Sequence, residues 1–371
     1  MRAKARTPKR MALVACLVAL ASVALAPGAE AAVWVIKGRG SGHGVGMSQY
    51  GAYGLARHGH GYRSILRHYY QHTRIGHTRD STIRVLLDSG EGSVSFKRAT
   101  EACGRRLRRH RSYAFDASGS GVTLRDASGR TLASCGRAGT AQSKGTIRIG
   151  AQGLYRGRLR AKASGGGLLI INLVGLDAYA KGVVPNEMPS SWSRAALEAQ
   201  AVAARSYALA TGGGGSFDVY DDTRSQVYRG KGSETAATNV ACARTSDQVV
   251  RYGGHVATTY FYSSSGGQTE SVQFGFPGSE PVPYLKSVND PYDGISPDHT
   301  WKVRYRQGAI EPRLSGLFSG RLRKIRVVKR GDSPRIVLAR VVGSRGSSRI
   351  SGPGLQARLN LKSTWMRFTK R

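Results

Sequence analysis

Negatively charged side chains are scarce in this chain of 371 residues, where 22 Asp and Glu stand against 57 Lys and Arg, a formal net charge of +35. A field of that sign attracts polyanions, either nucleic acids or the anionic polymers of a cell wall. An Arg-rich composition that only keeps the protein soluble is a third explanation. The basic residues are scattered along the chain, and no zinc-finger, RNP or basic-zipper pattern occurs. This scatter weakens the nucleic-acid explanation, so we expect no nucleic acid as a partner, while anionic cell-wall polymers and a merely solubilising composition stay open.

Cysteine is also rare, with four residues in the whole chain. Cys103 and Cys135 could close one loop in an oxidising compartment, which would contribute roughly 3–4 kcal/mol in the chain-entropy model. Cys242 is then expected to be a buried free thiol, since no CxxC or Cys/His spacing surrounds it. We expect no metal and no cofactor.

Long apolar runs are absent beyond the N-terminus. Residues 1–31 combine a basic segment (MRAKARTPKR), an apolar run (MALVACLVALASVALA) and an A-x-A signal at 29–31, which together predict a signal peptide with a mature chain from Ala32. No later run reaches the ~18–20 residues of a membrane span. We expect a secreted protein with no membrane span after signal cleavage, either soluble or associated with the cell wall through its charge.

Four segments follow the predicted signal peptide, and they indicate an α+β fold that is mostly β. Residues 32–80 are rich in Gly and His, with a strand (VWVI), a Gly loop (GRGSGHGVG) and two short helices. Residues 81–173 show short alternating runs typical of a small all-β subdomain. Residues 174–300 contain one long helix, and residues 301–371 carry basic strands that close the core.

The long helix is expected to start near residues 190–193 and to end at the glycines 212–215. It is apolar on most faces, which is typical of a buried helix. Arg205 inside it needs an anionic or carbonyl partner. Glu187 stands just upstream between two prolines, where an acid can simply favour the helix N-terminus.

Five motifs together resemble the SpoIID/LytB family (stage II sporulation protein D and the amidase enhancer LytB). They are GRGSGHGVGMSQYGAYGLARHG, GVVPNEMPSSWSRAALEAQAVAARSYAL, DTRSQVYRG, FYSSSGGQTES and YLKSVNDPYD, and they span most of the mature chain. The family's GHGVGMSQ block usually closes the domain, whereas here it opens the chain. The resemblance therefore implies a circularly permuted order, with residues 42–49 close to Glu187 or to Trp365.

The resemblance implies a lytic transglycosylase that cleaves MurNAc-GlcNAc strands of peptidoglycan and forms 1,6-anhydroMurNAc. Strands denuded of stem peptides are among the substrates that it implies. The Glu of the E-M-P motif is the family's acid/base, which corresponds to Glu187. One carboxyl group can suffice, because the sugar's own 6-hydroxyl attacks and no water is activated. The alternative is a non-catalytic wall-binding protein that enhances an N-acetylmuramoyl-L-alanine amidase.

Further residues are candidates for the same groove. Arg205 could clamp a substrate carboxylate, with a structural ion pair as the alternative. The candidate contacts to glycan are Gln200, Ser263, Ser265, Gly266, Gly267, His43 and Gln49. A plain turn is the alternative for the Ser-Gly loop of residues 263–267, and a structural role is the alternative for His43. The other acids considered are Asp177, Asp221, Asp222 and Glu270, each favoured as structural. His68 and His72 have an i, i+4 spacing on an expected helix, but no third metal ligand is evident.

Overall fold

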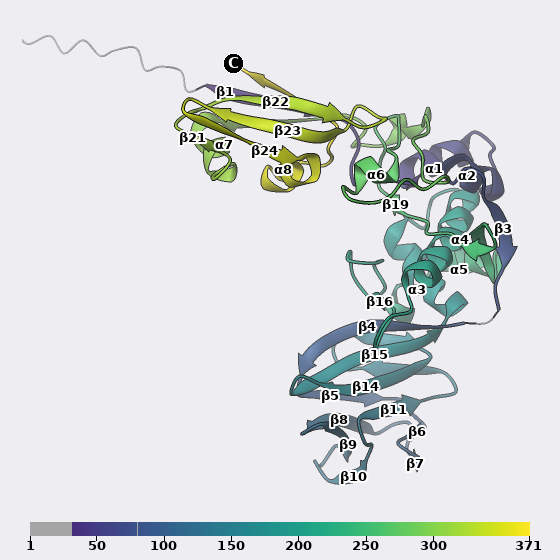
Figure 1. Ribbon diagram of the computed structural model, residues 1–371. Helices are drawn as coiled ribbons and strands as arrows, with labels where there is room; N and C mark the ends of the chain where they lie inside the picture. Colours follow the sequence, from purple (N-terminus) through teal and green to yellow (C-terminus); the bar gives the residue numbers. More distant parts are fainter. Residues whose placement is uncertain (1–31, 80) are drawn as a thin grey trace, which may run out of the picture.

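The structure is a computed structural model that describes residues 32–79 and 81–371, so the predicted signal peptide lies outside it. Figure 1 shows three bodies arranged in an arc: a β body drawn lowest, a central body with most of the helices, and a C-terminal sheet drawn at the top. Each body has a main cluster of buried apolar side chains, and the cluster of the β body extends into the central body through Tyr179, Val183, Ala204 and Ala208. The α+β, mostly β class predicted from the sequence is confirmed.

The β body consists of two sheets with strand orders β10-β9-β8-β5-β12-β13 and β16-β4-β15-β14-β11-β6-β7. All pairs are antiparallel except the parallel pair of β16 and β4. Alternation sets which side chains face inward; in β5, Val94 and Phe96 are buried between exposed neighbours. The strands are β4 (Thr82–Glu91), β5 (Ser93–Lys97), β6 (Glu101–Ala102), β7 (Arg105–Arg106), β8 (Ser112–Ser118), β9 (Gly121–Asp126), β10 (Thr131–Ser134), β11 (Ala138–Gln142), β12 (Thr146–Ile149), β13 (Gly153–Arg156), β14 (Arg158–Ser164), β15 (Gly167–Gly175) and β16 (Val219–Tyr220).

A disulfide joins Cys103 and Cys135, whose Cα atoms are 5.5 Å apart. Cys103 lies between β6 and β7 of one sheet, and Cys135 directly follows β10 of the other. The bond therefore ties the two sheets together, and the predicted pairing is confirmed. Among the described residues Cys242 is the free cysteine, and it is buried, as expected.

The central body surrounds α4, which is buried along most of its length. The helix starts after Ser193 and ends at Gly212, so both predicted boundaries are confirmed. Its neighbours include α3, which follows β15 directly and was not predicted. The helices are α1 (Gln49–Arg57), α2 (Tyr62–Tyr69), α3 (Leu176–Glu187), α4 (Arg194–Thr211), α5 (Ala236–Arg244) and α6 (Val272–Gly275), with 3-10 turns η1 (Gly230–Ser233) and η2 (Asp293–Ile295). Short strands complete it: β2 (Met47–Ser48), β3 (Arg74–His77), β17 (Gln248–Tyr252), β18 (His255–Val256) and β19 (Phe261–Tyr262).

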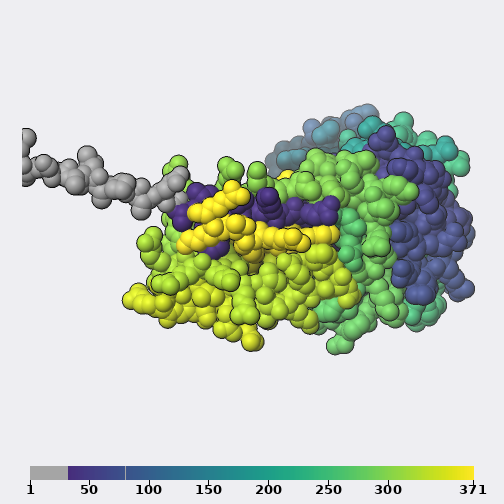
Figure 2. Space-filling view, turned by 90° about the horizontal axis from the view of Figure 1, so that it is seen from above, coloured from purple at the N-terminus to yellow at the C-terminus, as the bar shows by residue number. Residues whose placement is uncertain are grey.

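The C-terminal body joins the two ends of the described chain. β1 is the middle strand of a three-stranded sheet and pairs antiparallel with both β20 and β25. Figure 2 shows these purple N-terminal residues side by side with the yellow C-terminal residues. The remaining strands form a four-stranded sheet in the order β21-β24-β23-β22. The elements are β1 (Val33–Gly38), β20 (Trp301–Arg306), β21 (Phe318–Ser319), β22 (Leu322–Arg330), β23 (Ile336–Gly343), β24 (Gly346–Ser351), β25 (Met366–Lys370), α7 (Gln307–Arg313) and α8 (Gly352–Arg358).

The chain passes from β1 into the central body through the Gly loop of residues 38–46. The N–H of Gly42 donates to the carbonyl of Lys362 at 2.9 Å, and Ser41 exchanges backbone hydrogen bonds with Ser264. The expected meeting of the Gly loop with the C-terminal segment is therefore present. No helix in residues 32–79 or 81–371 is long and apolar enough to cross a membrane.

Candidate functional site

Glu187 is the last residue of α3 and stands where the helix gives way to the extended residue Met188. The carboxyl group accepts two hydrogen bonds: Oε1 from the N–H of Val227 at 2.8 Å and Oε2 from Nε2 of Gln49 at 3.4 Å. Burial raises the pKa of Glu187, and the two hydrogen bonds oppose that rise because they favour the ionised form. The effect of burial on the pKa is the larger one, so Glu187 stays protonated to a higher pH than an exposed Glu does.

A cavity of about 400 Å³ opens over this carboxyl group. Aromatic rings form much of its wall, and they come from α4, β19 and the segments beside β19 and α6. The lining residues are His43, Glu187, Tyr207, Thr223, Arg224, Ser225, Val227, Tyr260, Phe261 and Phe276. Glu187 is the only carboxylate that lines this cavity in the described chain. A ligand in it would meet one acid, several aromatic faces and one permanently charged cation, Arg224.

The other acids considered from the sequence are all engaged elsewhere. Asp177 pairs with Arg205 at 2.6 Å, Asp221 with Arg229 at 3.2 Å, and Asp222 with Arg224 at 2.8 Å. Glu270 accepts from the Oγ of Ser333 at 2.7 Å and from backbone N–H groups. Their structural assignment agrees with these contacts, and Glu187 differs from all four because its carboxyl group alone among them lines the cavity.

His43 borders the cavity, but both of its ring nitrogens are occupied by backbone. Nδ1 accepts from the N–H of Val45 at 3.1 Å, so Nε2 carries the proton and donates to the carbonyl of Phe261 at 3.1 Å. Burial lowers the pKa of His43 to about 4, with repulsion from Arg335 as a smaller cause. The imidazole is therefore neutral at pH 7. Its ring packs 4.9 Å from that of Phe276, so it ties the Gly loop to β19 and presents a ring face to the cavity.

The Ser-Gly loop, residues 263–267, is organised by one buried carboxylate, that of Asp293. Its two oxygens accept from the hydroxyl of Ser264 and from the N–H groups of Ser265 and Gly266, at 2.8–2.9 Å. The hydroxyl of Ser48 and Nδ1 of His299 donate to it at 3.0 Å. These contacts agree with the turn that was the alternative to glycan binding. Gly266 has φ +77°, and an added Cβ would stand 2.7 Å from the Cβ of Arg39.

Arg205 is completely buried in α4. Nε donates to Oδ1 of Asp177 at 2.6 Å, and the other nitrogens donate to the hydroxyl of Thr245 and the carbonyl of Cys242 at 3.2 and 2.7 Å. Each guanidinium nitrogen thus has a partner inside the protein, which agrees with the ion pair that was the alternative to a substrate clamp. Gln200 is also completely buried, and neither side-chain atom finds a hydrogen-bond partner in the described structure.

The two histidines with helical spacing do not share a helix. α2 ends at Tyr69, and His72 has φ +58° in the turn that follows. The expected i, i+4 geometry is therefore wrong, because the helix ends at Tyr69 and His72 lies in a turn. Residues 32–79 and 81–371 contain no group of three His, Cys, Asp or Glu side chains arranged to hold a metal ion.

Sequence reasoning missed several residues of the site. Phe276 lies outside the five motifs, and Tyr207 lies within one but was not singled out, since their role appears only when separate segments meet around the cavity. Val227 contributes a backbone N–H, which no side-chain pattern reveals. Asp293 was available as the second acid of the motif YLKSVNDPYD, where Pro and Asp together are typical of a turn.

Comparison with known proteins places this site in a family context. Residues 164–252 match the family model SpoIID, stage II sporulation protein. Among curated proteins, an uncharacterized protein of Brachyspira hyodysenteriae is 39% identical over 125 residues, covering 33% of each chain. The amidase enhancer of Bacillus subtilis is 44% identical over 117 residues, covering 31% of this chain and 16% of the relative. Stage II sporulation protein D of Bacillus subtilis is 29% identical over 163 residues, covering 39% of this chain and 47% of the relative. The chain thus spans less than half the length of each of these three.

Proposed function

Residues 164–252 are a SpoIID/LytB family region, as the motifs predict, and from this premise we propose that the protein cleaves the MurNAc-GlcNAc strands of peptidoglycan as a lytic transglycosylase. Glu187 carries the proposal. It is an acid with a raised pKa and no cationic partner in the described chain, at the edge of an aromatic-lined cavity with no second lining carboxylate. The proposal includes secretion to an anionic cell wall and a permuted order of the family's segments.

The reaction needs one proton donor that later accepts a proton. Protonated Glu187 gives its proton to the glycosidic oxygen while the bond from that oxygen to C1 of MurNAc breaks. The 6-hydroxyl of the same sugar then bonds to C1, and its proton passes to the Glu187 carboxylate. The products are a 1,6-anhydroMurNAc end and a free GlcNAc hydroxyl, and the acid is restored without water. A raised pKa supports the first step, because a larger fraction of the acid is protonated at neutral pH.

The cavity wall has the chemistry that a sugar needs. Rings of Tyr207, Tyr260 and Phe261 offer apolar faces against which the C–H face of a sugar can pack. Arg224 is more than half exposed although it pairs with Asp222. We assign to Arg224, in place of Arg205, the contact with a lactyl or stem-peptide carboxylate, since Arg205 is sealed in the core.

Mass spectrometry of purified glycan strands, with and without stem peptides, tests the proposal. Wild-type protein should release anhydro-muramyl products, and the Glu187→Gln variant should release none. Asp221→Asn is the matched control, because it neutralises an acid that pairs with Arg229 and does not line the cavity, and it should retain cleavage. Reducing ends in place of anhydro ends would reveal a hydrolase, and full cleavage by Glu187→Gln would disprove the role of this acid.

A second candidate is a non-catalytic, wall-binding enhancer of an N-acetylmuramoyl-L-alanine amidase. The observation that favours it is the 44% identity to the amidase enhancer of Bacillus subtilis. This function needs the cavity but not its acid. Amidase activity on cell walls should then rise equally with wild-type protein and with Glu187→Gln, and neither protein should release anhydro products.

A further inference from the structure

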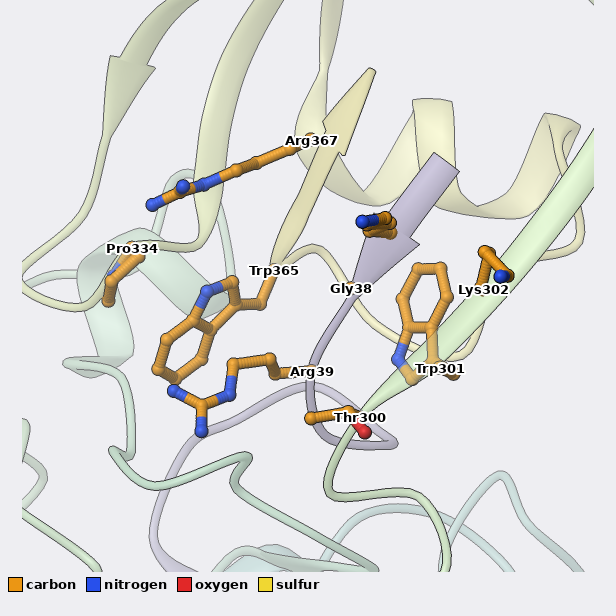
Figure 3. Close-up of a pocket in the computed structure, with 9 residues that line it drawn as sticks. Gly38, Arg39, Thr300, Trp301, Lys302, Pro334, Trp365 and Arg367 are labelled. Atoms are coloured by element: carbon orange, nitrogen blue, oxygen red, sulfur yellow. The ribbon is translucent and has the colours of Figure 1, made fainter. Parts of the chain in front are cut away.

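A second cavity, of about 610 Å³, lies in the C-terminal body and shares no lining residue with the cavity at Glu187. Two tryptophans and four cations surround it, and no acid does. Figure 3 shows Trp365 and Trp301 on either side of the Gly38–Arg39 segment, with Arg367 above Trp365 and Lys302 beside Trp301. Nothing in the proposed cleavage reaction uses these residues.

Strand register places three of the cations directly opposite one another. Lys37 in β1 pairs with Lys302 in β20 on one side and with Arg367 in β25 on the other. All three side chains are exposed, and none forms an ion pair with a carboxylate in the described chain. Like charges directly opposite on neighbouring strands destabilise a sheet. Burial lowers the pKa of Arg330, and the charge of Arg367 lowers it further.

The tryptophans are held in place independently of any ligand. The Trp301 ring lies directly on Gly38, where an added Cβ would stand 2.1 Å from the ring, and its Nε1 donates to the carbonyl of Gly40 at 2.8 Å. Trp365 is nine-tenths buried beneath the Arg39 guanidinium, which lies 5.4 Å from the ring centre. Arg39 in turn donates to Nε2 of His299 at 2.8 Å. The cavity therefore combines fixed aromatic surfaces with a row of uncompensated cations.

We propose that this cavity is a second glycan site, which binds a sugar-bearing phosphodiester polymer of the cell wall. The C–H face of a sugar packs against an indole, while phosphates replace the missing counter-charges along the row Lys302–Lys37–Arg367. Two of these three cations are lysines, which bind phosphate as point charges, and the third is an arginine, whose planar fork can bind phosphate through two hydrogen bonds. The site holds the protein on the wall and leaves the Glu187 cavity open.

Binding of purified polymers at about 0.15 M salt, where the Debye length is about 8 Å, tests this site. The probes are poly(glycerol phosphate) bearing glucosyl groups, the same polymer without sugar, polygalacturonate and a short DNA duplex. All proteins carry Glu187→Gln, so cleavage cannot contribute, and a failure of the cleavage mechanism would leave the result unaffected.

The test variant is Lys37→Gln/Lys302→Gln/Arg367→Gln. The control, Arg323→Gln/Lys324→Gln/Arg326→Gln, removes the same charge from exposed positions of β22 in the same body. We expect the test variant to bind the glucosylated polymer roughly tenfold more weakly, and the control to stay within about twofold of the parent. Trp301→Leu should lose the preference for the glucosylated over the bare polymer, and Trp301→Phe should keep most of it.

Equal losses in the two triple variants would overturn the proposal in favour of a diffuse positive field. If DNA and the bare polymer bind equally well and Trp301→Leu changes neither, charge alone would explain the binding and there would be no sugar site. Tighter binding of polygalacturonate would overturn the assignment of phosphate. Circular dichroism of each variant verifies that the sheet is intact, and Trp301→Phe keeps the aromatic test valid if Trp301→Leu unfolds.

Discussion

The side-chain amide of Gln49 donates to the carboxyl group of Glu187, across 138 residues of sequence. The helix that begins at Gln49 and the helix that ends at Glu187 are therefore joined at the candidate acid. The contact also tunes that acid, because a donor favours the ionised carboxylate and lowers its pKa.

Replacement of Gln49 by Met, which has a similar length and no donor, should raise the pKa of Glu187 further. A general acid works only while protonated, so the rate falls as pH rises through this pKa. The falling limb of the profile of kcat/KM against pH should thus move to higher pH in Gln49→Met. A limb that stays in place, in a variant that folds and cleaves, would show that Gln49 does not tune the acid.

His43 should make stability depend on pH in a defined window. Its pKa in the folded protein is about 4, below the 6.5 of an exposed imidazole, so the unfolded chain binds more protons between these two pH values. The contribution of the neutral His43 ring to the free energy of unfolding is fully present above pH 6.5. It is lost as the pH falls toward 4, and the loss is at most roughly 3 kcal/mol.

Urea unfolding of wild type and of His43→Gln between pH 4 and 7 measures this contribution. The difference in unfolding free energy between the two proteins should shrink as pH falls, because only the wild type must protonate a buried ring. A difference that is constant across the window would contradict the neutral, enclosed His43.

Arg205→Met should destabilise the protein by about 3–5 kcal/mol, because it leaves the carboxylate of Asp177 and two buried acceptors without their donor. Chemical denaturation measures the loss of stability. The substitution Asp177→Asn should cost much less stability in the Arg205→Met variant than in the wild-type protein. Glycan affinity of the folded Arg205→Met fraction should be unchanged. If Arg205→Met had normal stability and lost only its glycan affinity, Arg205 would instead be the clamp for the substrate carboxylate.

The disulfide should stabilise the β body without supporting catalysis. Cys103→Ser/Cys135→Ser opens a loop with a sequence separation of 32 residues, which predicts a loss of roughly 3–4 kcal/mol in unfolding free energy. Calorimetry under oxidising conditions should show a lower Tm, while the folded variant cleaves glycan at the wild-type rate. Lost cleavage in a folded variant would mean that the β body contributes to the site.

Local patterns were enough to predict some elements. Helix α4 was predictable from its apolar composition and from Ser193 and Gly212 at its ends, and the strands of the β body from their alternation. Helix α3 was not, because Gly182 and Pro185 lower helix propensity and only packing in the core overrides that. The hydrogen bond from Val227 to Glu187 and the five donors at Asp293 join separate segments, so no local pattern contains them.

The middle position of β1 has a consequence for the order of events during synthesis. β1 is among the first described residues to leave the ribosome, yet one of its partners, β25, is among the last. At about 5–20 residues per second, β1 waits for tens of seconds with an unpaired edge on each side. The other two bodies can close meanwhile, so the C-terminal sheet is the last to assemble. A chain that stops before Met366 would leave that edge of β1 permanently open to foreign strands.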